Sequence, residues 1–326
     1  MHSACNAHAV QWFVVAMLAA QGTFAADTFP IRPMRLIIPF PPGGGTDIMG
    51  RMVAQRLNDA FGMPVVVDNR GGAAGIIGTE MAARANPDGH TLMIGSVSTI
   101  CINPSLHKNL AFDPVKDLAP ISLVASTPSL LVVGSTLPVK SVKELIALAK
   151  AKPGQLHYAT PGSGSSSHLG TELFKQVAGV NIQHVPYKGT GPAVTDLISG
   201  QVSMFITNMP SVLPMVKAGR VRALAVTSLQ RSTLAPDLPT VAESGIPGFE
   251  VIVWYGVLAP AAVPKALLAR LNQEIRKMSD MQDVKDKLAL LGAEAMSSTP
   301  EAFAQRIRDD LSKWGKIVRD TGAKAD

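Results

Sequence analysis

Cysteine, aromatic residues and charge are all scarce in this sequence of 326 residues. The two cysteines, Cys5 and Cys101, can form at most one disulfide, which excludes a small scaffold held together by several disulfides. Cys101 lies between Ile100 and Ile102, so we predict that it is a small buried hydrophobic side chain. Charged residues make up 17% and hydrophobic residues 47% of the chain, enough apolar material for a large core. The length is typical of two domains of about 150 residues each.

The first 25 residues contain no Asp, Glu, Lys or Arg. Ala9–Ala20 is an almost continuous apolar run, too short to cross a bilayer as a helix. Thr23-Phe24-Ala25 follows, with small residues where signal peptidase requires them. The segment before the run departs from the usual pattern, since it has His2 and His8 but no Lys or Arg. We predict a signal peptide over 1–25 and a periplasmic location for the mature protein.

Several signatures of nucleotide, metal and nucleic-acid binding are missing. The net charge is +6, but the basic residues are scattered, which argues against a nucleic-acid partner. The glycines at 43–45 are followed by Thr46-Asp47 and not by the Lys of a P-loop, and the glycine spacing of a dinucleotide site is absent. The seven histidines form no His-Glu-x-x-His motif and no Cys/His cluster, so we predict neither a metal nor a cofactor. His168 and Glu172 have helical spacing but are too few for a metal, and we expect His168 on the surface or behind a site.

Short apolar runs alternate with amphipathic segments over the rest of the chain, which predicts an α/β fold. In the first part we expect parallel strands at 35–40, 64–67 and 91–95, with helices after the glycines at 43–45 and 71–78; Thr46 or Asp47 would cap the first helix. The pattern restarts at the capping box Ser141-Val142-Lys143-Glu144, with strands at 156–160, 182–187, 202–206 and 221–227. A last strand is expected at 251–258, before helices that start at Pro264 and at Ser298-Thr299-Pro300-Glu301.

This order of elements predicts two lobes, each a parallel-dominated sheet flanked by helices. The C-terminal helices have no sheet of their own, so lobe 1 would comprise 26–125 and 251–326, and lobe 2 would comprise 126–250. Two strand crossings, at Ile121–Ser126 and near Val251–Leu258, would join the lobes. The cleft between them is a natural place for a ligand.

Two loops rich in glycine and serine lie between a strand and a helix, one in each predicted lobe: Pro41–Asp47 and Pro161–Ser167. Backbone N–H groups at a helix N-terminus attract an anion, glycines let it approach, and Thr46 and Ser165–Ser167 can add hydroxyl donors. Either loop alone is equally consistent with an ordinary capped turn. Because there is one in each lobe, we expect the two loops to grip one carboxylate from both sides.

The second loop also allows a weaker alternative, a periplasmic serine hydrolase, because several serines lie beside His168. No Gly-x-Ser-x-Gly elbow is present, and neighbours in sequence do not make a catalytic triad. We therefore predict that the protein is not an enzyme. Lys188, at the end of a predicted strand, could attract an anion or could be an ordinary exposed loop lysine.

Motifs throughout the mature chain resemble those of Bug-type (TctC-like) periplasmic solute-binding receptors of the tripartite tricarboxylate transporter family. They are Leu36–Asp47, Asn86–Leu92, Pro153–Leu156, His184–Gly189, Arg222–Thr227, Pro239–Glu243 and Trp254–Gly256. The resemblance implies a periplasmic-binding-protein fold, type II-like, that closes on its ligand. It also implies that the first loop of each lobe holds a ligand carboxylate.

Carried onto this sequence, the resemblance assigns ligand contacts to both lobes. The implied residues are Gly44, Gly45, Thr46, Asp47, Ser96 and Ser98 in lobe 1, and Thr160, Gly162, Ser163, Gly164, Ser165, Ser166 and Asn208 in lobe 2.

Two positions depart from the family pattern. Asn69-Arg70-Gly71-Gly72 stands where the family often has Asn-Arg-Pro-Gly, and Thr207 stands where it often has an acidic residue. Without that carboxylate we expect a dicarboxylate, tricarboxylate or aromatic carboxylate in preference to an amino acid.

The expected role is a monomeric receptor that captures a small carboxylate. It would deliver this ligand to a membrane permease of one large and one small subunit, or present its closed form to a sensor kinase.

Overall fold

The computed structural model describes residues 29–107 and 109–324, so the predicted signal peptide and Cys5 lie outside the described residues. The first part of the chain alternates strands and helices: β1 (Met34–Ile38), α3 (Gly45–Phe61), β2 (Val65–Asn69), η2 (Ala73–Gly75), α4 (Ile76–Ala83), β3 (Thr91–Ser96), η3 (Ser98–Ile102) and α5 (Asn103–Leu106). β1 lies between β2 and β3 and is parallel to both, as the alternating pattern predicted.

A second α/β unit follows after a long strand. Its elements are β4 (Leu118–Gly134), α6 (Val142–Ala151), β5 (His157–Thr160), α7 (Ser166–Ala178), β6 (Gln183–Pro186), α8 (Thr190–Ser199), β7 (Met204–Asn208), α9 (Met209–Lys217) and β8 (Val221–Val226). β5 pairs in parallel with β6 and β7. The predicted capping box is confirmed at α6, where the Ser141 hydroxyl accepts the N–H of Glu144 at 3.2 Å.

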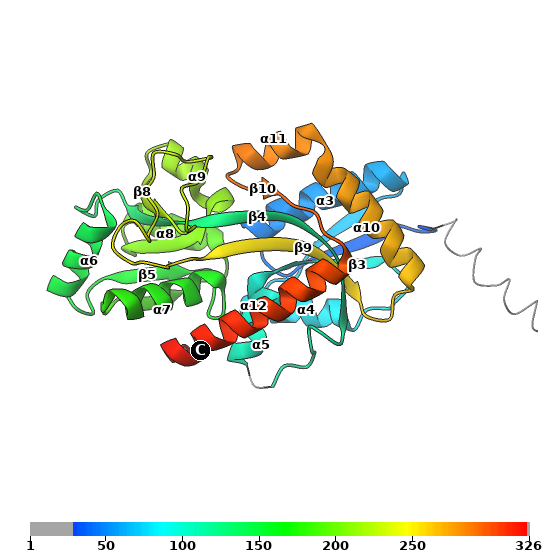
Figure 1. The fold of residues 1–326 in the computed structure, drawn as a ribbon, viewed down its shortest axis with the longest axis horizontal. Helices are drawn as coiled ribbons and strands as arrows, with labels where there is room; N and C mark the ends of the chain where they lie inside the picture. The colour runs from blue at the N-terminus through cyan, green and yellow to red at the C-terminus, as the bar shows by residue number, and fades with distance from the viewer. Residues whose placement is uncertain (1–28, 108, 325–326) are drawn as a thin grey trace, which may run out of the picture.

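Two strands connect the halves of the molecule, which confirms the predicted strand crossings. β9 (Ile252–Pro260) is antiparallel to β3 on one side and to β4 on the other. β4 pairs with β9 up to Pro128, and from Ser129 onward it pairs with β7 and β8 instead. Figure 1 shows β4 and β9 side by side through the middle of the molecule.

The resulting sheet has the order β2-β1-β3-β9-β4-β7-β5-β6, with β8 and β10 (Glu294–Ala295) also paired to β4. Parallel pairs occupy the two ends, but every pair that involves β4 or β9 is antiparallel. The sheet is therefore mixed, and the expectation of parallel-dominated sheets holds only for its ends. Parallel neighbours are usually connected through a helix. β4 and β9 instead cross between the halves and have no such helical connection to the strands beside them, so they can pair antiparallel.

The continuous apolar run in β4 is explained by two cores on opposite faces of the sheet. Leu131 and Val133 belong to the main core, which includes residues from both halves, and Leu130 and Val132 belong to a second core under α8 and α9. Alternate residues of a strand face opposite sides, so a strand covered on both faces is apolar at every position. Cys101 is also fully buried in the main core, as predicted.

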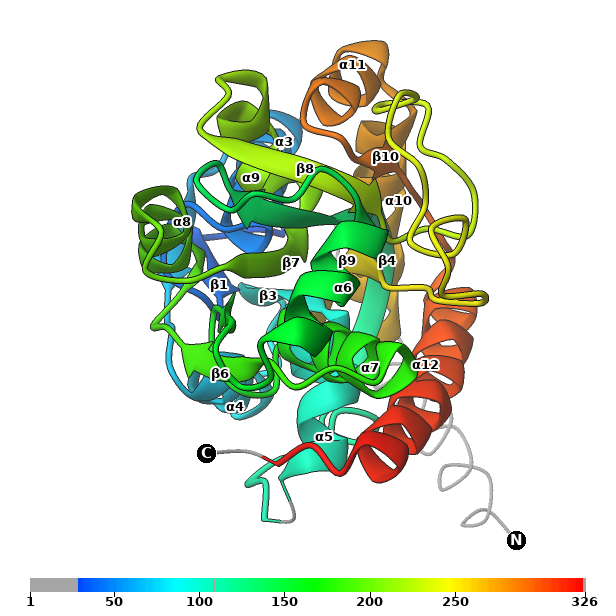
Figure 2. The same cartoon turned by 90° about the vertical axis from the view of Figure 1, so that its left-hand side faces the viewer.

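Three C-terminal helices pack mainly on the first half of the molecule: α10 (Lys265–Asp280), α11 (Gln282–Leu290) and α12 (Pro300–Thr321). α12 packs on η3, α5 and β4, and it also reaches α7 in the second half. Figure 1 and Figure 2 show this helix along one side of the molecule, next to α7. The lobe boundaries 26–125, 126–250 and 251–326 stay a prediction. Among the described residues, no helix has the length and hydropathy that crossing a membrane requires.

Candidate ligand-binding site

A small cavity lies where strands from both halves of the molecule end. Ser96 is the last residue of β3 and Asn208 is the last residue of β7, while Pro161 comes directly after β5 and Phe40 comes two residues after β1. Parallel strands bring their carboxyl ends to one edge of a sheet, where α/β proteins commonly bind ligands. This inner cavity has a volume of about 30 Å³. It has room for about two water molecules, or for one group of the size of a carboxylate.

Four helices begin at the inner cavity. Their N-cap residues are Gly44 before α3, Ser165 before α7, Gly189 before α8 and Asn208 before α9, and all four line the cavity. The first turn of a helix has N–H groups without helical partners and carries a partial positive charge of about half an elementary charge. Four such ends around one small space favour an anion there.

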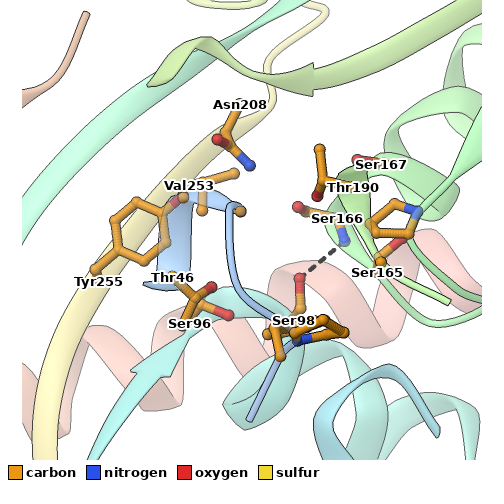
Figure 3. Close-up of a pocket in the computed structure, with 16 residues that line it drawn as sticks. Thr46, Ser96, Ser98, Ser165, Ser166, Ser167, Thr190, Asn208, Val253 and Tyr255 are labelled. Atoms are coloured by element: carbon orange, nitrogen blue, oxygen red, sulfur yellow. Dashed lines mark hydrogen bonds between the residues drawn. The ribbon is translucent and has the colours of Figure 1, made fainter. Parts of the chain in front are cut away.

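Neutral hydrogen-bonding groups line this space. The amide of Asn208 is one of them. The others are hydroxyl groups, which come from both halves: Thr46, Ser96, Ser98, Ser165, Ser166, Ser167, Thr190 and Tyr255. Figure 3 shows these side chains grouped around the gap between the two halves. Within the described part of the chain, no Asp, Glu, Lys, Arg or His lines the inner cavity. Tyr255 is fully buried, and burial raises the pKa of its phenol, so the hydroxyl keeps its proton and can donate.

The two halves touch directly at the inner cavity. The backbone N–H of Ser166 donates to Oγ of Ser98 at 2.9 Å, the contact drawn as a dashed line in Figure 3. Gly45 is equally close to the second half, since a Cβ at this position would lie 2.6 Å from Oδ1 of Asn208. A side chain at position 45 would collide with Asn208, so glycine allows the two halves to approach closely here.

Asp47 supports the first loop and does not line the inner cavity. Its carboxylate accepts the N–H of Gly43 at 3.0 Å, the amide of Asn69 at 2.9 Å and the guanidinium of Arg51 at 3.0 Å. Burial alone would raise the pKa of Asp47, but the hydrogen bonds from Arg51, Gly43 and Asn69 outweigh it and lower the pKa. The helix cap also differs from the prediction, because Gly44 is the N-cap and no side chain caps α3.

Thr160 and Gly164 likewise shape the second loop from behind. The hydroxyl of Thr160 lies 2.7 Å from Nε2 of His184 and accepts the N–H of Gly162 at 3.3 Å. Nδ1 of His168 accepts the N–H of Gly164 at 3.2 Å, and the His168 and His184 rings stack with centroids 4.5 Å apart. His168 is therefore buried behind the loop, and the alternative of a surface position is wrong.

A second, larger compartment adjoins the inner cavity. It has a volume of about 630 Å³ and lies between the loops 69–75 and His107 of the first half and the loops 161–163 and 186–189 of the second. The two spaces share four lining residues: Phe40, Pro41, Pro161 and Gly189. We call this space the outer compartment.

The structure brings most of the predicted site residues together. Eight of them line the inner cavity: Gly44, Gly45, Thr46, Ser96, Ser98, Ser165, Ser166 and Asn208. Gly162 and Ser163 line the outer compartment. Asp47, Thr160 and Gly164 line neither space and support the loops instead. The assignment of ligand contacts to these residues stays a prediction.

Sequence reasoning missed Tyr255 and Thr190. Tyr255 is part of the apolar run of β9, where nothing in the sequence separates it from a core aromatic residue. Thr190 follows a strand and a Tyr-Lys-Gly turn, and that strand-turn-helix order is the signal that could have identified it.

Thr207, on which the expectation about amino acids depended, lines neither space. It is buried, and its Oγ1 has no hydrogen-bond partner among the described residues. The neighbouring Asn208 lines the inner cavity instead. The argument against an ammonium group therefore comes from the cavity lining as a whole and not from position 207.

Comparison with known proteins identifies the family. Residues 49–323 match the family model described as the tripartite tricarboxylate transporter family receptor. The chain belongs to this receptor family. It is 41% identical to protein BugT of Bordetella pertussis over 317 residues, which cover 97% of each chain.

Two solved structures agree with this assignment to the receptor family. One is that of R. palustris Rpa4515 with adipate, which has a TM-score of 0.89 and 36% identity and covers 91% of this chain and 100% of the other. The other is the periplasmic binding protein BugD, with a TM-score of 0.87, 34% identity and the same coverage. The fold is thus the periplasmic-binding-protein fold, and the protein is a TctC-type, Bug-like solute-binding protein.

Proposed function

We propose that this receptor captures a small carboxylate in the periplasm and delivers it to a membrane permease of one large and one small subunit. The observation that carries the proposal is the inner cavity, where four helix N-termini and a set of hydroxyls converge and no charged side chain of the described residues is in the lining. Such a site stabilises one negative charge through backbone dipoles and neutral donors. The adipate in the similar Rpa4515 structure supports the choice of a carboxylate.

The lining also favours a ligand without an amino group. An ammonium group that leaves water needs a carboxylate or several acceptors as partners. No acidic side chain lines either space within the described residues. Aspartate and glutamate should therefore bind more weakly than dicarboxylates of the same length.

Closure couples binding to delivery. The ligand stabilises the closed form by its preference for that form, and the closed form then presents both halves to the permease in a fixed arrangement. The hydrogen bond from Ser166 to Ser98 joins the two halves across the inner cavity, so opening the molecule would break it. No comparable observation supports the sensor kinase or the hydrolase.

The proposal is tested by a thermal-shift screen of the purified mature protein, after removal of any bound ligand by unfolding and refolding. The panel contains mono-, di- and tricarboxylates, aromatic carboxylates and amino acids. A ligand that binds the native state adds about 3 kcal/mol of stability at a hundredfold excess over Kd, and the melting temperature rises accordingly. We expect shifts with carboxylates that lack an amino group. Shifts with amino acids alone, or with no carboxylate, would overturn the proposal.

A further inference from the structure

The inner cavity is too small for a whole ligand. With about 30 Å³ it accommodates one carboxylate group, and the rest of any longer molecule must lie elsewhere. The outer compartment is the adjoining space, and with about 630 Å³ it is in the range of small-molecule pockets. A ligand whose first carboxylate lies in the inner cavity therefore extends past the residues that the two spaces share.

Pro41 is one of the four residues that line both spaces, and glycines pack against its ring. A Cβ at Gly71 would lie 2.8 Å from Cδ of Pro41, and a Cβ at Gly189 would lie 3.1 Å from its Cγ. Position 71, where the family pattern often has proline, is glycine here. A larger residue would collide with the ring of Pro41 unless one of them moved. An apolar segment of the ligand suits this shared lining, because Phe40, Pro41 and Pro161 present few polar groups there.

The outer compartment contains the positive charge that the inner cavity lacks. Lys188 lines it and forms no ion pair within the described residues. His107 lines it as well, and its Nε2 is buried without a hydrogen-bond partner in the part of the chain that the structure describes. Burial lowers the pKa of His107, so near neutral pH its ring is uncharged and offers one N–H donor or one acceptor. No acidic side chain among the described residues lines this space.

The backbone on one wall of the compartment is held in an unusual shape. Ala73 and Ala74 have φ angles of 46° and 50°, in the left-handed region that costs a non-glycine residue about 1 kcal/mol or more. The amide of Asn103 donates to the carbonyl of Ala74 at 3.0 Å and secures this turn. A strained turn maintained by a buried side chain is typical of a wall that contacts a ligand.

We propose that the ligand is an elongated dianion, with one carboxylate in the inner cavity and the second anionic group in the outer compartment beside Lys188 and His107. This inference rests on the proposed function, since it presumes that the inner cavity binds a carboxylate. It makes Lys188 a specificity-determining residue, which distinguishes dicarboxylates from monocarboxylates of equal length.

The test compares adipate with hexanoate, which has the same chain length but only one carboxylate, by isothermal titration calorimetry. The protein is the full mature chain, as wild type and as Lys188→Met. The control is Lys150→Met, which removes a lysine of α6 that is also exposed and that lines neither space. We expect Lys188→Met to weaken adipate about fivefold, the effect of an exposed ion pair, and to leave hexanoate unchanged. The loss should shrink in high salt, since salt screens an exposed charge.

The outcomes separate the two proposals. If wild type binds adipate and hexanoate equally, or if Lys188→Met affects both to the same extent, the dianion inference fails while the carboxylate receptor stands. If malate and succinate bind but adipate does not, the outer compartment does not hold the second anionic group and the inference also fails. If no carboxylate of any length binds wild type, the proposed function fails and the inference fails with it. In His107→Asn, a neutral side chain replaces a neutral side chain. This variant should therefore keep most of the preference for adipate over hexanoate, because the positive charge is on Lys188.

Discussion

At the scale of single residues, the inner cavity depends on neutral donors and not on cations. A lysine or arginine gives a strong but weakly directional attraction, whereas hydroxyls and backbone N–H groups accept only ligands whose oxygens lie in the right places. Thr46 is such a donor, because it lines the cavity in the first turn of α3. The specificity of the site should therefore depend on many small contributions.

Replacement of Thr46 by valine tests this view. Thr46→Val keeps the shape of the side chain and removes the hydroxyl, so we expect carboxylate affinity to fall about fivefold, from a loss of about 1 kcal/mol. The melting temperature of the ligand-free protein should change little. Thr46→Ser is the matched control, because it restores the hydroxyl and should bind nearly as well as wild type. Unchanged affinity in Thr46→Val would remove Thr46 from the site.

Asp47 acts on the first loop through its charge. Its pKa is lowered in the folded protein, so its stabilising effect is present above the ordinary value of 3.8 and is lost as the pH falls through the lower folded value. We expect Asp47→Asn to cost about 1–3 kcal/mol at neutral pH, since charged hydrogen bonds are lost. The difference from wild type should diminish in thermal unfolding below about pH 4, where the carboxylate of the unfolded chain is protonated. A difference that is constant with pH would mean that the charge of Asp47 does not matter.

At the scale of elements, the helix N-termini do two tasks at once. Ser165 caps α7 by accepting the N–H of His168 at 3.2 Å, and it also lines the inner cavity. Ser141 caps α6 in the same way but lines neither space. The two serines thus have the same structural role, and only one of them lies where the ligand is proposed to bind.

The pair Ser165→Ala and Ser141→Ala separates capping from binding. Each substitution removes one cap, which should cost about 1 kcal/mol in chemical denaturation. Ligand affinity, measured by calorimetry, should fall only in Ser165→Ala. If both variants bind like wild type, the hydroxyl of Ser165 serves the helix alone.

At the scale of the whole molecule, the proposed function requires two halves that share one sheet to move relative to each other. β4 and β9 pass between the halves, and the main core includes residues from both. We propose that the hinge lies at the crossing strands, and that opening would break the hydrogen bonds across the inner cavity. The hydrogen bond from Ser166 to Ser98 is one of these.

Ser98→Ala should shift the molecule toward the open form. The lost hydrogen bond is worth about 0.5–1.5 kcal/mol, so we expect carboxylate affinity to fall between about twofold and tenfold. Small-angle X-ray scattering should show the same compact form as wild type at saturating ligand, reached at a higher concentration. Ser105→Ala, which removes a hydroxyl bonded to the carbonyl of Cys101, is the control and should close like wild type. Compaction of Ser98→Ala at the wild-type ligand concentration would contradict a role in closure.

The sequence by itself determined the local structure. The strand-loop-helix order, the capping box at Ser141 and the burial of Cys101 follow from spacing and residue type, which act over a few neighbours. The two glycine- and serine-rich loops could also be found from the sequence, because each lies between a predicted strand and a predicted helix. A helix N-terminus attracts an anion, so the loops could be proposed as binding sites. Even the crossing strands could be expected, since the C-terminal helices lack a sheet of their own.

Only the tertiary structure decided which of these residues face the cavity. Three residues of the same loops do not line the cavity and have hydrogen-bond partners elsewhere. Asp47 binds Arg51, Thr160 binds His184, and Gly164 binds His168. Tyr255 came into the site from a strand far along the chain, because β9 lies beside β3. Contacts between distant segments depend on the order in which the strands pair in the sheet, and no local sequence pattern contains that information. The outer compartment likewise depends on the tertiary structure, since its walls come from both halves.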